Sequence, residues 1–193
     1  MTRLILCRHA EAGRAEQAAA LAIKFDGTAI AAVYTSPLER AADTARALAA
    51  RHNLRLVEVG DLREIDFGEA RGLTFEELPQ DLRTALLQHP TEVRFPGGET
   101  YSELQRRVTN ALDEVVDAHP GATVAVVSHA GAIRAALAAW LRMADDAAFR
   151  LDQRPAAVNV VDWFDGTPFV RLVNGTEPEV GSPAARRRRT MRA

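Results

Sequence analysis

The sequence predicts an α/β domain with a largely parallel sheet, because patterns of buried strands alternate with helical patterns along the chain. Three short apolar runs carry this prediction: Leu4–Cys7, "IAAVYTS" at 30–36 and "TVAVVS" at 123–128. Such near-continuous runs are typical of strands that are covered on both faces. The length of 193 residues suits one domain with its own core, and no linker or internal repeat divides the chain.

Two helices and a further strand are predicted in the first part of the chain. Residues 14–25 are rich in Ala, Leu, Glu and Gln, which favour a helix. Ser36 and Pro37 indicate the start of a second helix, with Ser36 as its cap and Pro37 in its first turn. The alternation of apolar and polar residues over 54–59 predicts a strand.

The second part begins with an irregular stretch, 60–98, that contains one predicted helix near Thr74–Gln88 and a turn at "PGG". An amphipathic helix from Tyr101 onward follows, with apolar residues at helical spacing. The remaining predicted elements are the strand "TVAVVS", a helix over about 131–143, and strands within "AAVNVVDWF" at 156–164 and "FVRLVN" at 169–174.

Composition narrows the class of protein. The net charge of −2 gives no reason to expect a nucleic acid or an anionic membrane as a partner. The end of the chain is basic, and we expect a domain over 1–180 followed by a disordered tail over 181–193. Cys7 is the only cysteine, which excludes an internal disulfide and favours a cytoplasmic protein. The sequence shows neither a secretory signal nor an apolar stretch of ~20 residues.

Two of the five histidines stand where predicted strands end. His9 follows "LILCR", His129 follows "VAVVS", and small residues that lead into a helix come after each. Ligands of open α/β sheets bind beyond the carboxyl ends of the strands, so both histidines belong to the same edge of the sheet. Arg8 adjoins His9, and Arg40 lies in the first turn of the helix after "YTS". Two guanidinium groups near helix N-termini favour a phosphate as the ligand.

Each of these residues also has an ordinary structural interpretation when it is taken alone. His52, His89 and His119 lie near helix ends or before prolines and need no functional role. A cysteine phosphatase requires a shorter spacing than the six residues between Cys7 and Arg14, so we expect Cys7 in the core. The sequence has no Gly-x-Gly-x-x-Gly after a strand and no spacing typical of a zinc site.

Five segments carry a more specific signal. They are "LILCRHAEAG", "VYTSPLERAADTARALA", "LREIDFGEARGLTFEEL", "FPGGETYSELQRRV" and "VVSHAGAIRAAL". In this order they resemble the motifs of the histidine phosphatase superfamily, also called the phosphoglycerate mutase-like family, and its phosphatase branch in particular. The resemblance extends from Thr2 to about Asn174, and it implies a three-layer α/β/α sandwich.

The resemblance also implies a role for particular residues. His9 matches the nucleophile that takes the phosphoryl group, and Glu64 in "LRE" matches the proton donor. The residues that match the phosphate pocket of the family are Arg8, Arg40, His129 and, through its main-chain N–H, Ala130. No metal and no other cofactor is implied, because arginines stabilise the charge on the phosphoryl oxygens.

Two departures from the family pattern concern this pocket. Ala10 and Ala130 stand where the family usually has Gly, which costs little unless the backbone needs a positive φ. About one loop's length is missing after Glu11, and Gly13 is the glycine expected to open the first helix. We therefore expect a shallower and more open pocket. This openness favours a phosphatase over a phosphoglycerate mutase, which must hold its intermediate in a closed site.

The expected function is that of a metal-independent phosphomonoesterase that acts on small phosphorylated metabolites through a phosphohistidine. The resemblance implies sugar phosphates, phosphoglycerate-type acids or an α-ribazole phosphate, without choosing among them. Two alternatives stay open: a phosphomutase, and a weakly active or non-catalytic member that binds phosphorylated ligands. Glu64 has its own alternative, an ion pair with Arg63 or Arg71. Many relatives dimerise, and the strand "VNVVDWF" is the candidate edge for a homodimer.

Overall fold

The three apolar runs form strands, as the sequence predicts, and these strands lie in the middle of the sheet. In the computed structural model, which describes residues 1–178, β1 (Thr2–Arg8) and β2 (Ala32–Thr35) flank β4 (Thr123–Ser128), and all three are parallel. The six strands lie in the order β3-β2-β4-β1-β5-β6. β3 (Leu56–Glu58) continues the parallel part on one side, while β5 (Val158–Phe164) and β6 (Thr167–Gly175) run antiparallel on the other.

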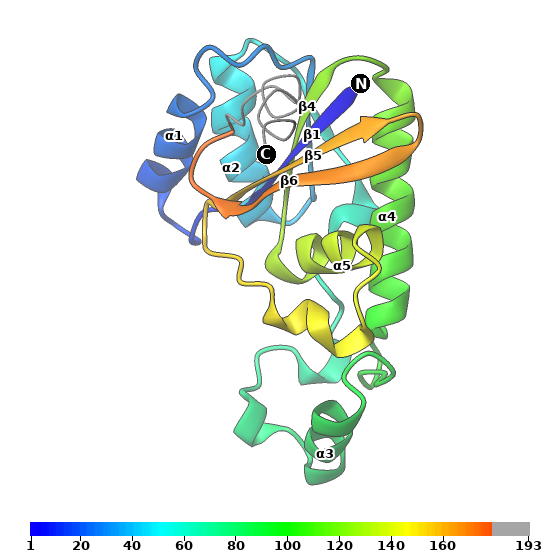
Figure 1. The fold of residues 1–193 in the computed structure, drawn as a ribbon. Helices are drawn as coiled ribbons and strands as arrows, with labels where there is room; N and C mark the ends of the chain where they lie inside the picture. Colours follow the sequence, from blue (N-terminus) through cyan, green and yellow to red (C-terminus); the bar gives the residue numbers. More distant parts are fainter. Residues whose placement is uncertain (179–193) are drawn as a thin grey trace, which may run out of the picture.

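Helices cover both faces of the sheet, which confirms the three-layer α/β/α prediction (Figure 1). α1 (Ala15–Ile23) and α2 (Glu39–Arg51) lie on one face, and α4 (Tyr101–Ala118) and α5 (Ala130–Trp140) lie on the other. The side chains of β1 alternate between the two layers. Ile5 and Cys7 pack toward α1 and α2, whereas Leu4 and Leu6 pack toward α4 and α5. Both halves of the core therefore depend on the same strand.

Cys7 lies in this core, as the sequence predicts. Its side chain is fully buried, and burial raises the pKa of the thiol to about 12. A thiol in that environment is not a nucleophile at neutral pH. Within residues 1–178, no helix is long and apolar enough to cross a membrane. The predicted tail, 181–193, lies outside the described residues.

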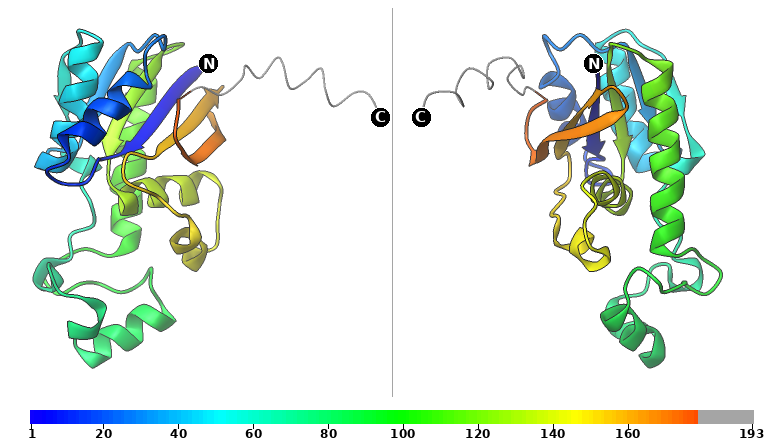
Figure 2. Two further views of the ribbon diagram at one scale, coloured as in Figure 1. Left: turned by 90° about the vertical axis from the view of Figure 1, so that its left-hand side faces the viewer. Right: turned by 45° about the vertical axis from the view of Figure 1, so that its right-hand side comes forward.

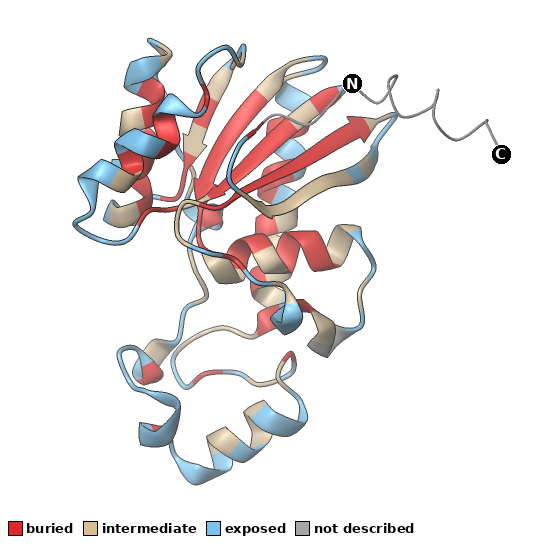
Figure 3. Ribbon diagram, turned by 60° about the vertical axis from the view of Figure 1, so that its left-hand side comes forward, coloured by how far each residue is buried: buried red, intermediate tan, exposed pale blue. Residues whose placement is uncertain are grey.

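The candidate edge strand for a homodimer is an interior strand. β5 pairs with β1 on one side and with β6 on the other, so β6 forms the edge of the sheet. The prediction was wrong because "VNVVDWF" is buried on both faces, which is the pattern of an interior strand. In Figure 3 the central strands are mostly red, for buried, while β6 is largely tan.

The segment between β3 and α4 extends away from the sheet as a small lobe over residues 65–98 (Figure 2). It contains two short 3₁₀ helices, η2 (Gly68–Ala70) and η3 (Phe75–Glu77), and one α-helix, α3 (Gln80–Gln88). The one helix predicted over Thr74–Gln88 is thus two elements. Leu78 is extended because the ring of Pro79 disfavours helical backbone in the residue before it.

The base of this lobe is a contact of backbone against backbone. The Glu69 N–H donates to the Pro96 carbonyl at 2.8 Å, and the Glu99 N–H donates to the Asp66 carbonyl at 3.0 Å. A Cβ added to Gly98 would lie 2.2 Å from the carbonyl oxygen of Asp66, so the residue at this position must lack a side chain. The glycines of "PGG" therefore allow the two arms of the lobe to touch.

Ser36 does not cap the helix that follows it. α2 begins at Glu39 with Leu38 as its N-cap, while Ser36 still belongs to the sheet through its N–H, which donates to the Val127 carbonyl at 3.0 Å. The Ser36 hydroxyl accepts a hydrogen bond from the Leu38 N–H at 3.2 Å. The serine thus ends the strand and leaves its hydroxyl at the carboxyl edge.

Candidate active site

The register of the parallel strands brings the two histidines together. Arg8 pairs with Ser128 at the last position of the β1–β4 ladder, so the next residues along the two strands are His9 and His129. The His9 N–H continues the ladder by donating to the Ser128 carbonyl at 2.9 Å. The two rings meet edge to face, with their centroids 5.0 Å apart. The carboxyl edge of the sheet therefore carries an imidazole pair, as expected from the strand ends.

The ring of His9 is held in one tautomer. Its Nδ1 lies 2.6 Å from the carbonyl oxygen of Ala10, to which it donates, and its Nε2 accepts from Nε of Arg40 at 3.1 Å. The lone pair is thus on Nε2. Burial, together with the charges of Arg40 and Arg8, lowers the pKa of His9, although the Ala10 carbonyl opposes the shift. The neutral imidazole, which is the nucleophilic form, is therefore favoured.

His129 is also kept neutral. It is fully buried, and its Nε2 lies 2.8 Å from the hydroxyl of Ser36. Burial lowers the pKa of His129 to about 3, and the positive charge of Arg40 adds to the effect. Its Nδ1 is buried without a hydrogen-bond partner among residues 1–178. An oxygen of a bound anion would give this nitrogen a partner.

Both predicted arginines lie at this edge. Arg40 is the second residue of α2, and its guanidinium reaches Nε2 of His9. Arg8 ends β1, and its Nη1 donates to the main-chain carbonyl of Gln153 at 2.5 Å. The Nε of Arg8 is buried and has no partner within the described part of the chain. Two positive charges and an unused donor thus surround the imidazole pair, which suits a phosphate.

The two alanines that replace glycines cause no backbone strain, since neither has a positive φ. The Ala10 N–H donates to the hydroxyl of Thr44 at 3.0 Å, which holds the turn after His9 against α2. Ala130 is the first residue of α5, so its N–H points out of the N-terminus of that helix. Gly13 lies two residues before α1, as expected, and has φ +76°, a conformation that glycine adopts readily.

Glu64 lies beside His129, at the N-terminus of α5. Its Oε2 accepts from the N–H of Gly131 at 3.0 Å, and its Oε1 accepts from the N–H of Ala132 at 3.2 Å. A Cβ on Gly131 would lie 2.3 Å from Oε1, so this glycine leaves the space that the carboxylate fills. Among residues 1–178, Glu64 forms the alternative ion pair with neither Arg63 nor Arg71, and the Arg71 guanidinium binds Asp66 at 2.9 Å.

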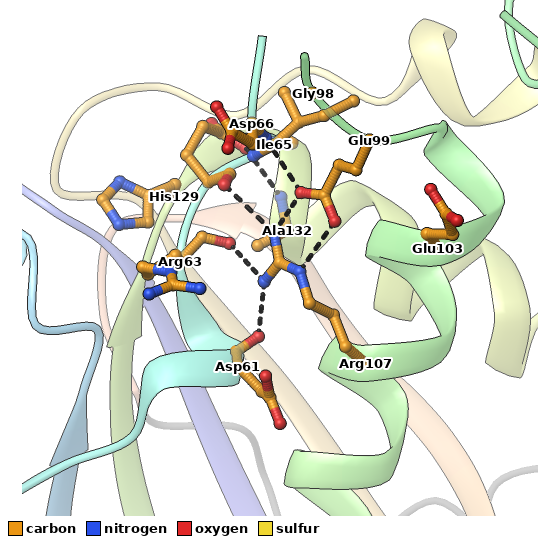
Figure 4. A network of polar contacts seen from close by, with 12 residues as sticks. Asp61, Arg63, Ile65, Asp66, Gly98, Glu99, Glu103, Arg107, His129 and Ala132 are labelled. Carbon is orange, nitrogen blue, oxygen red and sulfur yellow. Dashed lines mark hydrogen bonds and ion pairs between the residues drawn. The ribbon is translucent and has the colours of Figure 1, made fainter. Parts of the chain in front are cut away.

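Several residues that support this site were not singled out from the sequence. Ser36 contacts His129, Thr44 holds the turn after His9, and Gln153 orients Arg8. Arg107 and Glu99 hold the segment that carries Glu64, in the network that Figure 4 shows. Both residues lie within the segment "FPGGETYSELQRRV" at 95–108, but nothing in that segment indicates what they bind.

The profile of the histidine phosphatase superfamily (branch 1) matches residues 10–176. The chain belongs to the histidine phosphatase superfamily. This membership agrees with the resemblance read from the five motifs, and it accounts for the pairing of two histidines with two arginines at one sheet edge.

Relatives within the histidine phosphatase superfamily are named for different functions. A protein of Mycobacterium tuberculosis described as bifunctional is 40% identical over 151 residues, which span 76% of this chain but only 41% of that protein. Phosphoserine phosphatase 1 of Hydrogenobacter thermophilus is 34% identical over 163 residues, covering 73% of this chain and 77% of the relative. The solved structure of YhfR from Bacillus stearothermophilus shares the fold, with a TM-score of 0.84, 24% identity and coverage of 91% and 98% of the two chains.

Proposed function

We propose that this chain is a metal-independent phosphomonoesterase that hydrolyses small phosphorylated metabolites through a phosphohistidine at His9. One observation carries the proposal. Nε2 of His9 holds a lone pair in a buried, neutral ring, 3.1 Å from a guanidinium nitrogen of Arg40. A nucleophile and a group that binds phosphoryl oxygens thus lie side by side, which is the arrangement that phosphoryl transfer to a histidine needs.

In the first step, Nε2 of His9 attacks phosphorus from the side opposite the ester oxygen. An N–P bond forms and the P–O ester bond breaks. The arginine side chains and His129 hold the three remaining oxygens, and the Ala10 carbonyl stabilises the positive charge on the ring through Nδ1–H. Glu64, as the carboxylic acid, gives its proton to the departing alkoxide.

In the second step, a water molecule attacks the phosphohistidine. Glu64, now a carboxylate, takes a proton from the water, the N–P bond breaks, and its electron pair returns to Nε2 of His9. Inorganic phosphate leaves and the neutral imidazole is restored. No step requires a metal ion, because the negative charge on the phosphoryl oxygens is balanced by Arg8 and Arg40 and by the N–H of Ala130 at the N-terminus of α5.

The short connection after His9 supports hydrolysis over a mutase reaction. Residues 10–14 lead directly into α1, and a cavity of about 380 Å³ opens there, lined in part by Ala10 and Arg40. Water can therefore reach the edge of the site from this side.

The relative from Hydrogenobacter thermophilus that is named a phosphoserine phosphatase supports a small phosphorylated substrate. A single buried cysteine is consistent with a cytoplasmic location.

The test is release of inorganic phosphate in the presence of EDTA, from an aryl phosphate and from a panel of alkyl phosphates that includes phosphoserine. The wild-type chain is compared with His9→Ala and with His89→Ala, a matched change of an exposed histidine on the lobe. We expect turnover in EDTA that only His9→Ala abolishes. Acid-labile, base-stable labelling of the protein by a labelled substrate would identify the phosphohistidine. Turnover that survives in His9→Ala, or that EDTA abolishes, would contradict the proposal.

The same assay separates the two remaining alternatives. A phosphomutase would move the phosphoryl group to another hydroxyl of the substrate and release little phosphate. A protein that only binds phosphorylated ligands would show saturable binding without turnover and without labelling of His9.

A further inference from the structure

The side chain of Arg107 makes an unusually complete set of contacts around the segment that carries Glu64 (Figure 4). Its Nη1 donates to the main-chain carbonyls of Asp61 and Arg63, at 2.7 and 2.9 Å. Its Nη2 donates to the Glu64 carbonyl at 3.0 Å and to Oε1 of Glu99 at 2.5 Å, while its Nε donates to Oε2 of Glu99 at 3.0 Å. All five N–H donors of the guanidinium are therefore used.

Glu99 extends this clamp to the other side of Glu64. Its Oε1 also accepts from the N–H of Asp66 at 2.9 Å, and its own N–H donates to the Asp66 carbonyl at 3.0 Å. The carboxylate of Glu99 and the guanidinium of Arg107 together hold residues 61–66, which we call the clamped segment. Only 17% of the Arg107 side chain and 16% of the Glu99 side chain are exposed, so this ion pair is little screened by water.

The clamped segment needs such support because it lacks regular structure around Glu64. η1 (Gly60–Leu62) ends two residues before Glu64, and η2 begins four residues after it. No ladder of a strand or helix holds the backbone between them. Arg107, by contrast, projects from the second turn of α4, a helix with a capping box at Thr100 and a buried apolar face. The clamp thus ties an irregular segment to a rigid helix.

Glu64 is held at both ends as a result. Arg107 binds its main-chain carbonyl, and α5 binds its carboxylate through Gly131 and Ala132. We propose that Arg107 and Glu99 are positioning residues that place the Glu64 carboxyl for proton transfer, and thereby decide whether esters with poor leaving groups are hydrolysed. This inference rests on the proposed function, in which Glu64 protonates the departing oxygen.

The dependence of kcat/KM on the leaving group tests this role. An aryl oxide with a low pKa leaves without a proton, whereas an alkoxide needs one, so only alkyl esters depend on a well-placed acid. The variants are Arg107→Lys, which keeps the charge but cannot supply five donors, Glu99→Gln, and Glu64→Gln as the reference. Arg94→Lys is the matched control, because Arg94 also pairs with a glutamate of α4, Glu103 at 2.5 Å, but is 57% exposed.

We expect Arg107→Lys and Glu99→Gln to lower kcat/KM for alkyl esters by about 10- to 100-fold and for activated aryl esters by less than about 3-fold. The plot of log kcat/KM against leaving-group pKa becomes steeper in both, as in Glu64→Gln, and is unchanged in Arg94→Lys. In the double variant Arg107→Lys/Glu64→Gln, the slope is that of Glu64→Gln alone. An equal loss for all esters, or additive effects in the double variant, would overturn the proposal.

A second measurement keeps this inference separate from the proposed function. Hydrogen exchange of the Gly131 and Ala132 amides reports whether the Glu64 carboxylate stays at the N-terminus of α5, and it needs no turnover. We expect faster exchange in Arg107→Lys than in Arg94→Lys. If the Gly131 and Ala132 amides are protected from exchange in the wild type but the wild type hydrolyses no ester, the proposed function fails. If the wild type is active and Arg107→Lys protects both amides fully, the positioning role fails.

Discussion

His9 and Glu64 lie at the same edge of the sheet but reach it by different means. His9 extends β1, and its backbone is fixed by hydrogen bonds to β4 on one side and to the segment before β5 on the other. Glu64 lies on an irregular segment and is held by the Arg107 side chain of α4 and by main-chain N–H groups at the N-terminus of α5. The comparison teaches that the nucleophile is placed by the sheet, whereas the acid is placed by individual contacts that single substitutions can remove.

The largest effect on activity is expected beside the nucleophile, for the variant Arg40→Lys. Lysine cannot donate to Nε2 of His9 in the same geometry and also present a fork of donors to phosphoryl oxygens. We expect kcat/KM to fall by about 100- to 1000-fold, by a similar factor for aryl and alkyl esters. Arg46→Lys, on the same helix in an exposed pair with Asp43, serves as the control. A loss confined to alkyl esters would contradict the contrast between the nucleophile, which every ester needs, and the acid, which only alkyl esters need.

A smaller and selective effect is expected at the other end of Glu64, with Gly131→Ala. The new Cβ takes the space of Oε1, so the carboxylate must leave the amides of α5. We expect a loss of about 10- to 100-fold for alkyl esters and little change for activated aryl esters. Gly60→Ala is the control, because a Cβ there meets no atom within 4 Å. Full activity of Gly131→Ala on alkyl esters would contradict the position assigned to the acid.

The burial of His129 should make the free energy of unfolding depend on pH. Burial lowers the pKa of His129 in the folded protein to about 3, whereas the ordinary value of 6.5 applies in the unfolded chain, so between these values the unfolded chain binds more protons. Stability from this residue is complete above pH 6.5 and is lost as the pH falls toward 3. We expect about 2 kcal/mol to be lost between pH 6.5 and 5. Denaturant unfolding should show this loss reduced in His129→Asn and unchanged in His89→Asn.

The smallest effect is expected at Thr44→Val, which removes the hydroxyl that supports the turn after His9. The buried N–H of Ala10 loses its acceptor, and the carbonyl of Arg40 loses a donor. We expect a decrease of about 1 to 2 kcal/mol in the free energy of unfolding, with a minor change in kcat/KM. Urea unfolding at pH 7 measures the first quantity. A large fall in activity without loss of stability would place Thr44 among the groups that touch substrate.

The same contrast separates what the sequence predicts from what it does not. The three apolar runs, the histidines at their ends and the buried Cys7 follow from strand patterns and from the rule that ligands bind at the carboxyl edge. No sequence pattern predicts the hydrogen bonds from Arg107 to main-chain carbonyls, because every residue has a carbonyl. The role of the clamp therefore becomes visible only in three dimensions.

Two other differences between prediction and structure concern the helix near Pro79 and the place of β5 in the sheet. Pro79 marks the end of a helix by a local rule, yet the surrounding helix formers favoured one continuous element. The place of β5 in the sheet depends on the antiparallel partner that follows it, β6, whose intermediate burial marks it as the edge. Local patterns thus predict elements well, while neighbours in a sheet depend on the whole topology.

The backbone contact at the base of the lobe has a consequence for how this scaffold can vary. Because the two arms meet at Gly68 and Gly98, the chain leaves the body and returns to it at almost the same point. The entropy cost of closing a loop at such a point rises only slowly with the length of the loop, so the lobe can change in length while its two arms still meet beside Glu64. The lobe is in this sense an exchangeable module beside a fixed reaction centre, free to diversify while the chemistry stays the same.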